Sequence, residues 1–295
     1  MRVFVGQTLS WEHVEDALEV RLHRAPLNEI GMQTLTELEG VAEYVSGGAG
    51  GARALIWYSD REGFCAGADL RALHAGISER QKRLSGGVGR VARRIGPAGG
   101  LMKRGFRRLS TPLIRREIER FIDRIHAAFN ALDMAPLTTI AAVHGVCFGG
   151  GFELALTADL IIADKSARFC FPELRLGLIP GFGGIPRLNR DLGNAVVRDL
   201  LLTGRSLNAK RAHGVGLVSQ VVPRGNALQA ARSAARQAAR FDGHTAVAAK
   251  RFIKPLPVAE LARERALFAQ LVTRPEVYEA LTRFVENTEV RPYLP

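Results

Sequence analysis

The stretch IAAVHGVCFGGGFELAL, Ile140 to Leu156, joins an apolar run to a helix-like run through three consecutive glycines. A strand-length apolar run followed by a glycine turn and a helix is typical of an α/β protein with a parallel sheet. Glycine lets the backbone approach a ligand closely. The first N–H groups of a helix lack partners within it and lie at the positive end of its dipole. The stretch therefore predicts either an anion-binding turn or close packing of the helix on the sheet.

A second glycine turn occurs earlier, in FCAGADL, Phe64 to Leu70. Two backbone N–H groups, one from each turn, would form an oxyanion hole, a pair of donors that stabilises developing negative charge on an oxygen. The triplet carries no GxGxxG pattern and no GK[ST] follows it, so neither a dinucleotide-binding fingerprint nor a phosphate loop is indicated.

Two carboxylates accompany these turns. Glu153 follows the glycine triplet within the first turn of the expected helix, and Glu173 lies in FPELRLGLIPGFGG twenty residues later. Like charges in a confined site move their pKa values apart, so one acid holds a proton while the other accepts one. Each glutamate also has a structural interpretation, because acids are favoured in the first turn of a helix and after a proline.

The composition is that of a globular protein, with 295 residues, of which 47% are hydrophobic and 24% charged. No apolar run is long enough to span a bilayer, and the N-terminal residues lack the pattern of a signal peptide. The three cysteines are expected to be reduced thiols in a cytoplasmic setting, and no Cys/His spacing suggests a metal site.

The net charge of +12 is concentrated in one segment, since residues 79–124 contain fourteen Lys or Arg and four Asp or Glu. Within it, residues 76–115 are glycine-rich, basic and poorly periodic. We interpret them as an insert that is mobile or partly helical, with a regular helix resuming at residues 114–134. The insert suggests an RNA- or anionic-surface-binding function, although a solvated basic loop that attracts anionic ligands is the simpler explanation.

The remaining periodicity predicts an alternation of strands and helices. Strands are expected at residues 17–24 and 54–59, a helix at 28–45 and a strand pair at 159–171. The tail from residue 208 onward is predicted to be mostly helical.

Taken together, FCAGADL and the long stretch from Ile140 to Leu188 resemble the enoyl-CoA hydratase/isomerase (crotonase) superfamily. HRAPLNEIG and GLVSQVVP resemble further family segments, so the likeness covers the chain except for the basic insert. The resemblance implies a spiral of ββα units over residues 1–205 and a C-terminal helical trimerisation region over residues 206–295. It also implies a homotrimer or hexamer.

The resemblance further implies an acyl-CoA thioester substrate, with no separate cofactor because coenzyme A belongs to the substrate. The oxyanion N–H groups fall on Ala68 and Gly150, and the two hydratase acids match Glu153 and Glu173. Since many members of the superfamily lack one or both acids, their presence points to hydration of a 2-enoyl-CoA. Isomerisation of the double bond, or hydration of a branched or cyclic acyl-CoA, remains the alternative.

The coenzyme A contacts implied by the resemblance are less regular. The family often places a lysine just before the segment matching Pro26, where this chain has Ala25 with Arg24 beside it. Arg24 and Arg71 are therefore expected to bind phosphate, and Glu29, Ala68 and Leu70 to line the adenine pocket. Asp69 is expected to cap the turn, and Arg187 to have a structural or oligomeric role.

Overall fold

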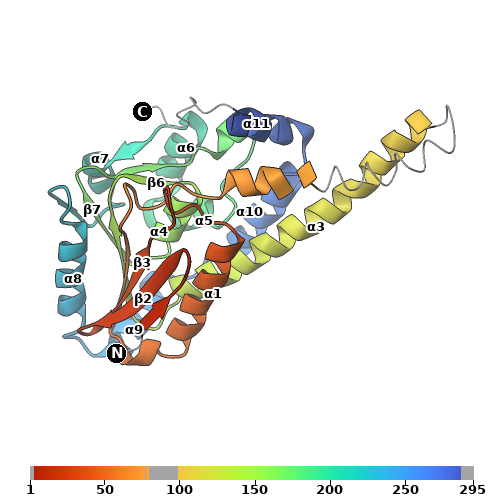
Figure 1. Cartoon of the computed structure of the whole chain (residues 1–295). Helices are drawn as coiled ribbons and strands as arrows, with labels where there is room; N and C mark the ends of the chain where they lie inside the picture. The colour runs from red at the N-terminus through yellow and green to blue at the C-terminus, as the bar shows by residue number, and fades with distance from the viewer. Residues whose placement is uncertain (1–2, 77, 80–98, 287–295) are drawn as a thin grey trace.

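The computed structural model describes residues 3–76, 78, 79 and 99–286, with the backbone alone for residues 99–115 (Figure 1). Its largest element is a seven-stranded sheet in which the first two strand pairs are antiparallel and the remaining four pairs are parallel. In spatial order its strands are β1 (Val3–Val5), β2 (Leu9–Val14), β3 (Ala17–Leu22), β4 (Ala54–Ser59), β5 (Thr138–Val143), β7 (Leu160–Asp164) and β10 (Gln220–Val222).

Side chains alternate between the two faces of this sheet, as the period of a strand requires. In β4, Leu55 and Trp57 face the larger core cluster, whereas Ala54 and Ile56 face a smaller one. Both faces are therefore buried, which explains why the parallel strands read as near-continuous apolar runs.

A smaller, three-stranded sheet carries the glycine triplet. It contains β6 (Val146–Phe148), β8 (Arg168–Cys170) and β9 (Leu207–Asn208). The chain passes from β5 to β6 through Gly145, whose φ is +55° and whose added Cβ would lie 2.3 Å from the Glu62 carbonyl oxygen. Only glycine fits this switch between sheets.

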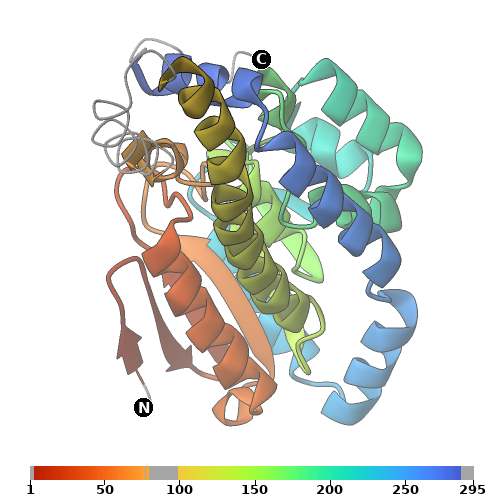
Figure 2. The same ribbon diagram turned by 90° about the vertical axis from the view of Figure 1, so that its right-hand side faces the viewer.

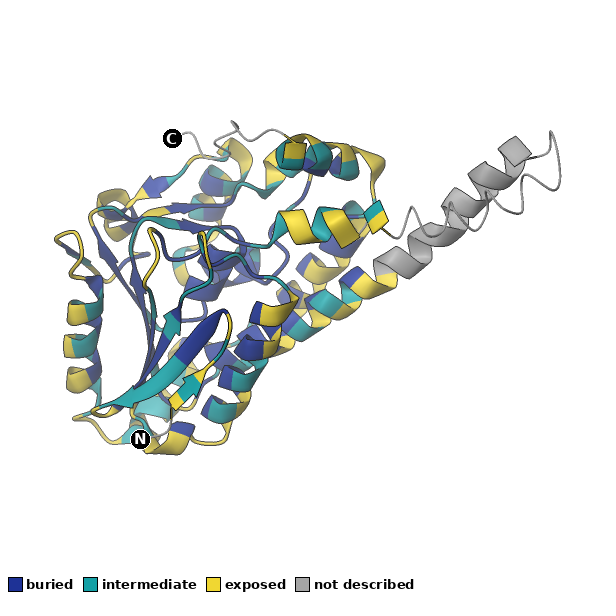
Figure 3. Cartoon of the chain, viewed as in Figure 1, coloured by how far each residue is buried: buried dark blue, intermediate teal, exposed yellow. Residues whose placement is uncertain are grey.

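Helices cover both faces of the large sheet (Figures 1 and 2). One face is covered by α8 (Ala227–Ala238), whose buried alanines Ala227, Ala231 and Ala235 recur every four residues. The other face is covered by α1 (Met32–Ser46) and α3 (Gly99–Asp133), and α3 lies between α1 and α10 in Figure 2. Figure 3 shows the same division, with buried residues concentrated between these layers.

The remaining helices follow the small sheet or form the C-terminal tail. They are α4 (Gly150–Ala155), α5 (Gly184–Leu192), α6 (Asn194–Thr203), α7 (Ala209–Gly214), α9 (Gly243–Ile253), α10 (Val258–Leu271) and α11 (Pro275–Glu286). Short 3₁₀ turns occupy Ala49–Gly51 and Glu173–Leu176. None of the described helices has the length and apolar character needed to cross a bilayer.

The architecture confirms the predicted mixed α/β fold with C-terminal helices, but three local expectations differ. The helix expected to begin at residue 114 begins at Gly99. The basic residues between Gly99 and residue 114 do not prevent helix formation. The expected strand pair at residues 159–171 is wrong as a pair, since β7 joins the large sheet and β8 the small one. The tail also contributes a strand, β10, to the large sheet. The division at residue 205 stays a prediction.

Candidate active site

The two glycine turns lie side by side because the strands that lead into them pair. Cys65 and Cys147 form a parallel bridge, and the Phe148 N–H donates to the Cys65 carbonyl at 3.0 Å. A Cβ added to Gly67 would lie 3.2 Å from the Gly150 nitrogen. The chain therefore brings the FCAGADL and GGGFE turns to one point, although more than eighty residues separate them.

Ala68 and Gly150 are the residues whose N–H groups meet there. A Cβ placed on Gly150 would lie 3.4 Å from the Ala68 nitrogen and 2.7 Å from the Phe182 ring. Within the described part of the chain, neither N–H group donates to a protein acceptor. Two adjacent, unused donors, one at the start of helix α4, are the arrangement expected of an anion-binding site.

Glu153 lies in the first turn of α4, the helix that begins at Gly150, and is 2% exposed. Its Oε1 accepts the Phe182 N–H at 2.7 Å and the Gly184 N–H at 2.8 Å. Burial raises the pKa of Glu153 to about 7, even though these two N–H groups act to lower it. The side chain is thus held in one place and titrates close to neutral pH.

Glu173 begins the 3₁₀ turn after β8, and its carboxylate points at the glycine triplet. Its Oε1 would lie 2.6 Å from a Cβ added to Gly149, so only glycine permits this approach. Its Oε2 is buried and has no hydrogen-bond partner among the described residues. Burial, and then the charge of Glu153, raise the pKa of Glu173 well above its usual value. A buried oxygen without a protein partner is the feature expected where a ligand supplies the partner.

A third acid, Glu264, was missed in the sequence. It lies on α10, 5% exposed, and accepts the Gly183 N–H at 2.7 Å and the Ile185 N–H at 2.9 Å. Burial, and then the charge of Glu153, raise its pKa well above the usual value. The available signal was a glutamate on the same helix face as Leu261 and Phe268, which are three and four residues away. We call Glu153, Glu173 and Glu264 the carboxylate cluster.

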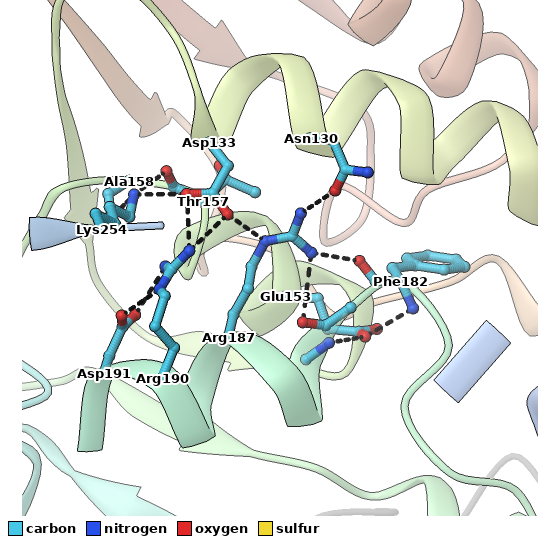
Figure 4. A network of polar contacts seen from close by, with 12 residues as sticks. Asn130, Asp133, Glu153, Thr157, Ala158, Phe182, Arg187, Arg190, Asp191 and Lys254 are labelled. Carbon is cyan, nitrogen blue, oxygen red and sulfur yellow. Dashed lines mark hydrogen bonds and ion pairs between the residues drawn. The ribbon is translucent and has the colours of Figure 1, made fainter. Parts of the chain in front are cut away.

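A second group of buried charged residues lies near Glu153 (Figure 4). Asp133, at the end of α3, contacts Arg187 at 2.7 Å, Arg190 at 3.0 Å and Lys254 at 3.0 Å. Burial alone would raise the pKa of Asp133, but these three cations outweigh burial and lower it. We call these four residues the Asp133 cluster.

Arg187 connects the two clusters. It is fully buried, and its guanidinium also donates to the Phe182 carbonyl at 3.0 Å and the Asn130 side chain at 2.6 Å. It therefore holds the segment that binds Glu153, consistent with the structural role expected from the sequence.

An apolar cavity of about 260 Å³ opens beside Ala68. The residues that line it belong to α1, α3 and α10, to the stretch that follows Ala68, and to the loop that contains Phe182. The main apolar side chains are Leu73, Ile118, Phe121, Ile122, Phe182 and Phe268. Ala68, one of the two N–H donors, and Phe182, whose ring lies beside Gly150, both line this cavity, so the cavity adjoins the donor pair.

The residues expected to contact coenzyme A lie near the same turn. Arg24 pairs with Asp69 and donates to the Glu29 carbonyl oxygen, and Asp69 accepts the Ala72 N–H at 2.8 Å, as its expected capping role requires. Leu70 packs against the core, and Arg71 donates to the Val285 carbonyl at 3.1 Å. Arg24 thus supports the turn that carries Ala68, and coenzyme A binding by these residues stays a prediction.

The thiols of Cys65 and Cys147 lie beneath the site. Both are buried, and Cys65 contacts the position where Gly151 would carry a Cβ. Burial raises the pKa of Cys65 to about 12 and that of Cys147 well above its usual value. Among described residues, no three His, Cys, Asp or Glu side chains are grouped as metal ligands. Within the basic insert proposed for nucleic-acid binding, residues 77 and 80–98 and the side chains of residues 99–115 lie outside the described part of the chain.

Comparison with known proteins gives one consistent family. The family described as enoyl-CoA hydratase/isomerase matches residues 116–291. A probable enoyl-CoA hydratase of Mycobacterium bovis is 37% identical over 173 residues, covering 57% of this chain and 67% of the relative. The 2,3-dehydroadipyl-CoA hydratase of Escherichia coli is 38% identical over 152 residues, covering 50% of this chain and 60% of the relative. The alignments thus span about two thirds or less of these relatives' lengths.

Solved structures extend the likeness to nearly the whole chain. The enoyl-CoA hydratase of Bacillus anthracis superposes with a TM-score of 0.67 at 26% identity, covering 95% of this chain and 96% of that one.

Proposed function

The chain belongs to the enoyl-CoA hydratase/isomerase (crotonase) family, and we propose that it adds water across the double bond of a 2-enoyl-CoA thioester to give a 3-hydroxyacyl-CoA. The observation that carries this proposal is the placement of two carboxyl groups, that of buried Glu153 and that of Glu173 with its buried Oε2, beside the unused N–H donors of Ala68 and Gly150. Relatives that are named hydratases support the reaction type.

The donors account for activation of the thioester. Its carbonyl oxygen accepts hydrogen bonds from Ala68 and Gly150, which stabilise the enolate that forms as the C2–C3 double bond is attacked. Removing one donor from such a site typically costs about 2.7–4 kcal/mol of transition-state stabilisation.

The two glutamates account for the proton movements. Glu153 receives two N–H bonds, which favour its ionised form, so it is the base that takes a proton from water attacking C3. Glu173 has an unpaired buried oxygen and a strongly raised pKa, so it is the acid that donates a proton to C2. One proton is taken and one is given, and coenzyme A takes part only as a portion of the substrate.

The cavity indicates the kind of acyl chain. Its described lining contains no lysine, arginine or histidine, while two acids, Asp69 and Glu117, are present. A carboxylate at the end of the acyl chain would lose hydration there without gaining a cation, which is unfavourable. We therefore expect an uncharged, apolar chain, in contrast to the substrate in the name of the 2,3-dehydroadipyl-CoA relative.

We also propose how the coenzyme A part of the substrate binds and how the subunits assemble. Arg24 and Arg71 would approach the phosphates of coenzyme A, with Glu29, Ala68 and Leu70 beside the adenine. A homotrimer or hexamer in the cytoplasm completes the proposal.

The test is a product analysis with crotonyl-CoA, longer unbranched 2-enoyl-CoAs and 2,3-dehydroadipyl-CoA. Hydration adds the mass of one water, whereas double-bond isomerisation leaves the mass unchanged. We expect the added water with the uncharged substrates and a much lower kcat/KM with dehydroadipyl-CoA. An unchanged mass with a moved double bond would instead establish the isomerase alternative.

A further inference from the structure

The segment Phe182–Ile185 presents four consecutive N–H groups to two acids in alternation. Glu153 accepts those of Phe182 and Gly184, and Glu264 accepts those of Gly183 and Ile185. Gly184 and Ile185 begin helix α5, so their N–H groups have no partner inside that helix and lie at its positive end. The two carboxylates therefore hold one short segment from its two sides.

Helix α10 is fitted closely to this segment. Leu261 would touch a Cβ on Gly183 at 2.7 Å, and Phe268 would touch one on Gly181 at 2.5 Å. Glu264 lies between these two residues on the same buried face. The backbone around Phe182 consequently has little freedom to shift unless α10 shifts with it.

Burying the carboxylate of Glu264 on the inner face of α10 is unfavourable, since desolvation opposes its ionised form. No cation of the Asp133 cluster forms an ion pair with Glu264 in the described structure. Gly183 and Ile185 are the partners of its carboxylate, so its placement is explained by what it does to this segment.

We propose that Glu264 is a positioning residue that fixes the carboxylate of Glu153 for catalysis. By binding the N–H groups of Gly183 and Ile185, it orients the intervening N–H groups of Phe182 and Gly184 toward Glu153 Oε1. This inference rests on the proposed hydratase function, because it assigns to Glu264 an effect on the base of that reaction. It also makes α10, from the C-terminal region, part of the support of the site.

The experiment is a double-mutant cycle with Glu264→Gln and Glu153→Gln, assayed by hydration of crotonyl-CoA. Glutamine keeps the shape but has one acceptor oxygen for two N–H groups, so the segment shifts. We expect kcat to fall about ten- to hundredfold with KM nearly unchanged, as small misplacements of a catalytic group do. On the Glu153→Gln background, the same substitution should change kcat by less than about twofold.

Two further variants complete the design. Glu260→Gln, an exposed glutamate on the same helix, is the matched control and should retain wild-type kcat. Glu264→Asp keeps the carboxyl group but retracts it by one methylene, and its loss of activity should likewise vanish on the Glu153→Gln background. This second variant carries the test if Glu264→Gln does not fold.

Equal losses of kcat in both backgrounds, or no loss at all, would overturn the inference and show Glu264 to be a stability residue. A crystal structure of Glu264→Gln gives a readout independent of activity. We expect displacement of the Glu153 carboxylate from the Phe182 and Gly184 nitrogens, and an unmoved carboxylate would also overturn the inference. A wild-type protein inactive toward every 2-enoyl-CoA would contradict the proposed function separately.

Discussion

The carboxylate cluster and the Asp133 cluster are adjacent, both are buried, and they differ in how their charge is balanced. Asp133 is surrounded by three cations, and its pKa is lowered. Glu153, Glu173 and Glu264 receive backbone N–H groups and form no ion pair among the described residues, and their pKa values are raised. Figure 4 shows Arg187 between Asp133 on one side and Glu153 on the other.

The difference separates a structural role for buried charge from a chemical one. A paired buried ion stays ionised and is expensive to disturb, because removing its partner leaves an uncompensated charge. An unpaired buried acid remains near the balance between its protonated and ionised forms, which is what proton transfer requires. Under the proposed function, burial therefore supports stability in the Asp133 cluster and proton transfer at Glu153 and Glu173.

The largest expected effect separates the clusters by activity. Glu153→Gln and Glu173→Gln should each lower kcat about 10²–10⁴-fold, the usual contribution of a general acid or base. Their free energies of unfolding at pH 8 should be unchanged or higher, because each removes a carboxyl whose ionised form is poorly compensated. Steady-state hydration kinetics and urea denaturation measure the two quantities. Full activity in both variants would disprove the assigned mechanism.

The next effect concerns stability. Asp133→Asn should lower the free energy of unfolding by about 3–5 kcal/mol, because Arg187, Arg190 and Lys254 would be left without their shared anion. Asp191→Asn, which affects a partly exposed partner of Arg190, is the control and should change stability by about 1 kcal/mol or less. Similar losses of unfolding free energy in the two variants would mean that the Asp133 cluster stabilises the protein no more than a partly exposed ion pair does.

The pH dependence of stability should have opposite signs in the two clusters. The raised pKa of Glu153 contributes stability that is fully present below about pH 4.5 and is lost as pH rises through about 7. The lowered pKa of Asp133 contributes stability that is present above about pH 3.8 and is lost in stronger acid.

Comparison of variants isolates the Glu153 contribution, since buried His126, with its pKa lowered to about 4, opposes it in the same range. The unfolding free energy of Glu153→Gln minus that of the wild type should increase from pH 4.5 to pH 8. A difference that stays constant over this range would contradict the raised pKa.

The smallest effect is expected at an exposed ion pair. Asp123 on α3 contacts Arg265 on α10, one residue from Glu264, and both side chains are about half exposed. Asp123→Asn should change the free energy of unfolding by about 1 kcal/mol or less and leave kcat unaltered. A loss of kcat here would mean that any contact between α3 and α10 affects the site, and would weaken the specific role given to Glu264.

The sequence was sufficient to predict those features of the fold and of the candidate site that depend on neighbouring residues. A strand, a glycine turn and a helix in immediate succession predicted the mixed α/β fold and singled out the glycine triplet and Glu153. The family resemblance then assigned the two N–H donors to Ala68 and Gly150, and the bridge between Cys65 and Cys147 brings these turns together. The catalytic roles themselves stay predictions.

The rest depends on contacts between distant residues. Glu264 is 81 positions from Gly183, whose N–H group it accepts. The sequence around Glu264 contains no pattern that identifies this partner. β7 pairs with β5 and β8 pairs with β6, and the turn at Gly145 sends β5 and β6 into different sheets. The composition of residues 159–171 does not reveal these partners. The start of α3 was missed because its first part lacks the apolar periodicity by which a helix is recognised.

The two thiols beneath the glycine turns provide a built-in chemical reporter of the site. The ionised sulfur is the nucleophile that attacks a thiol reagent. Both Cys65 and Cys147 are buried with raised pKa values, so the closed protein should react very slowly. Modification should then proceed chiefly through transient separation of the two turns, and its rate would measure the free energy of that opening. An acyl-CoA bound across Ala68 and Gly150 would tie the turns together and slow the labelling, so ligand occupancy becomes measurable without catalysis.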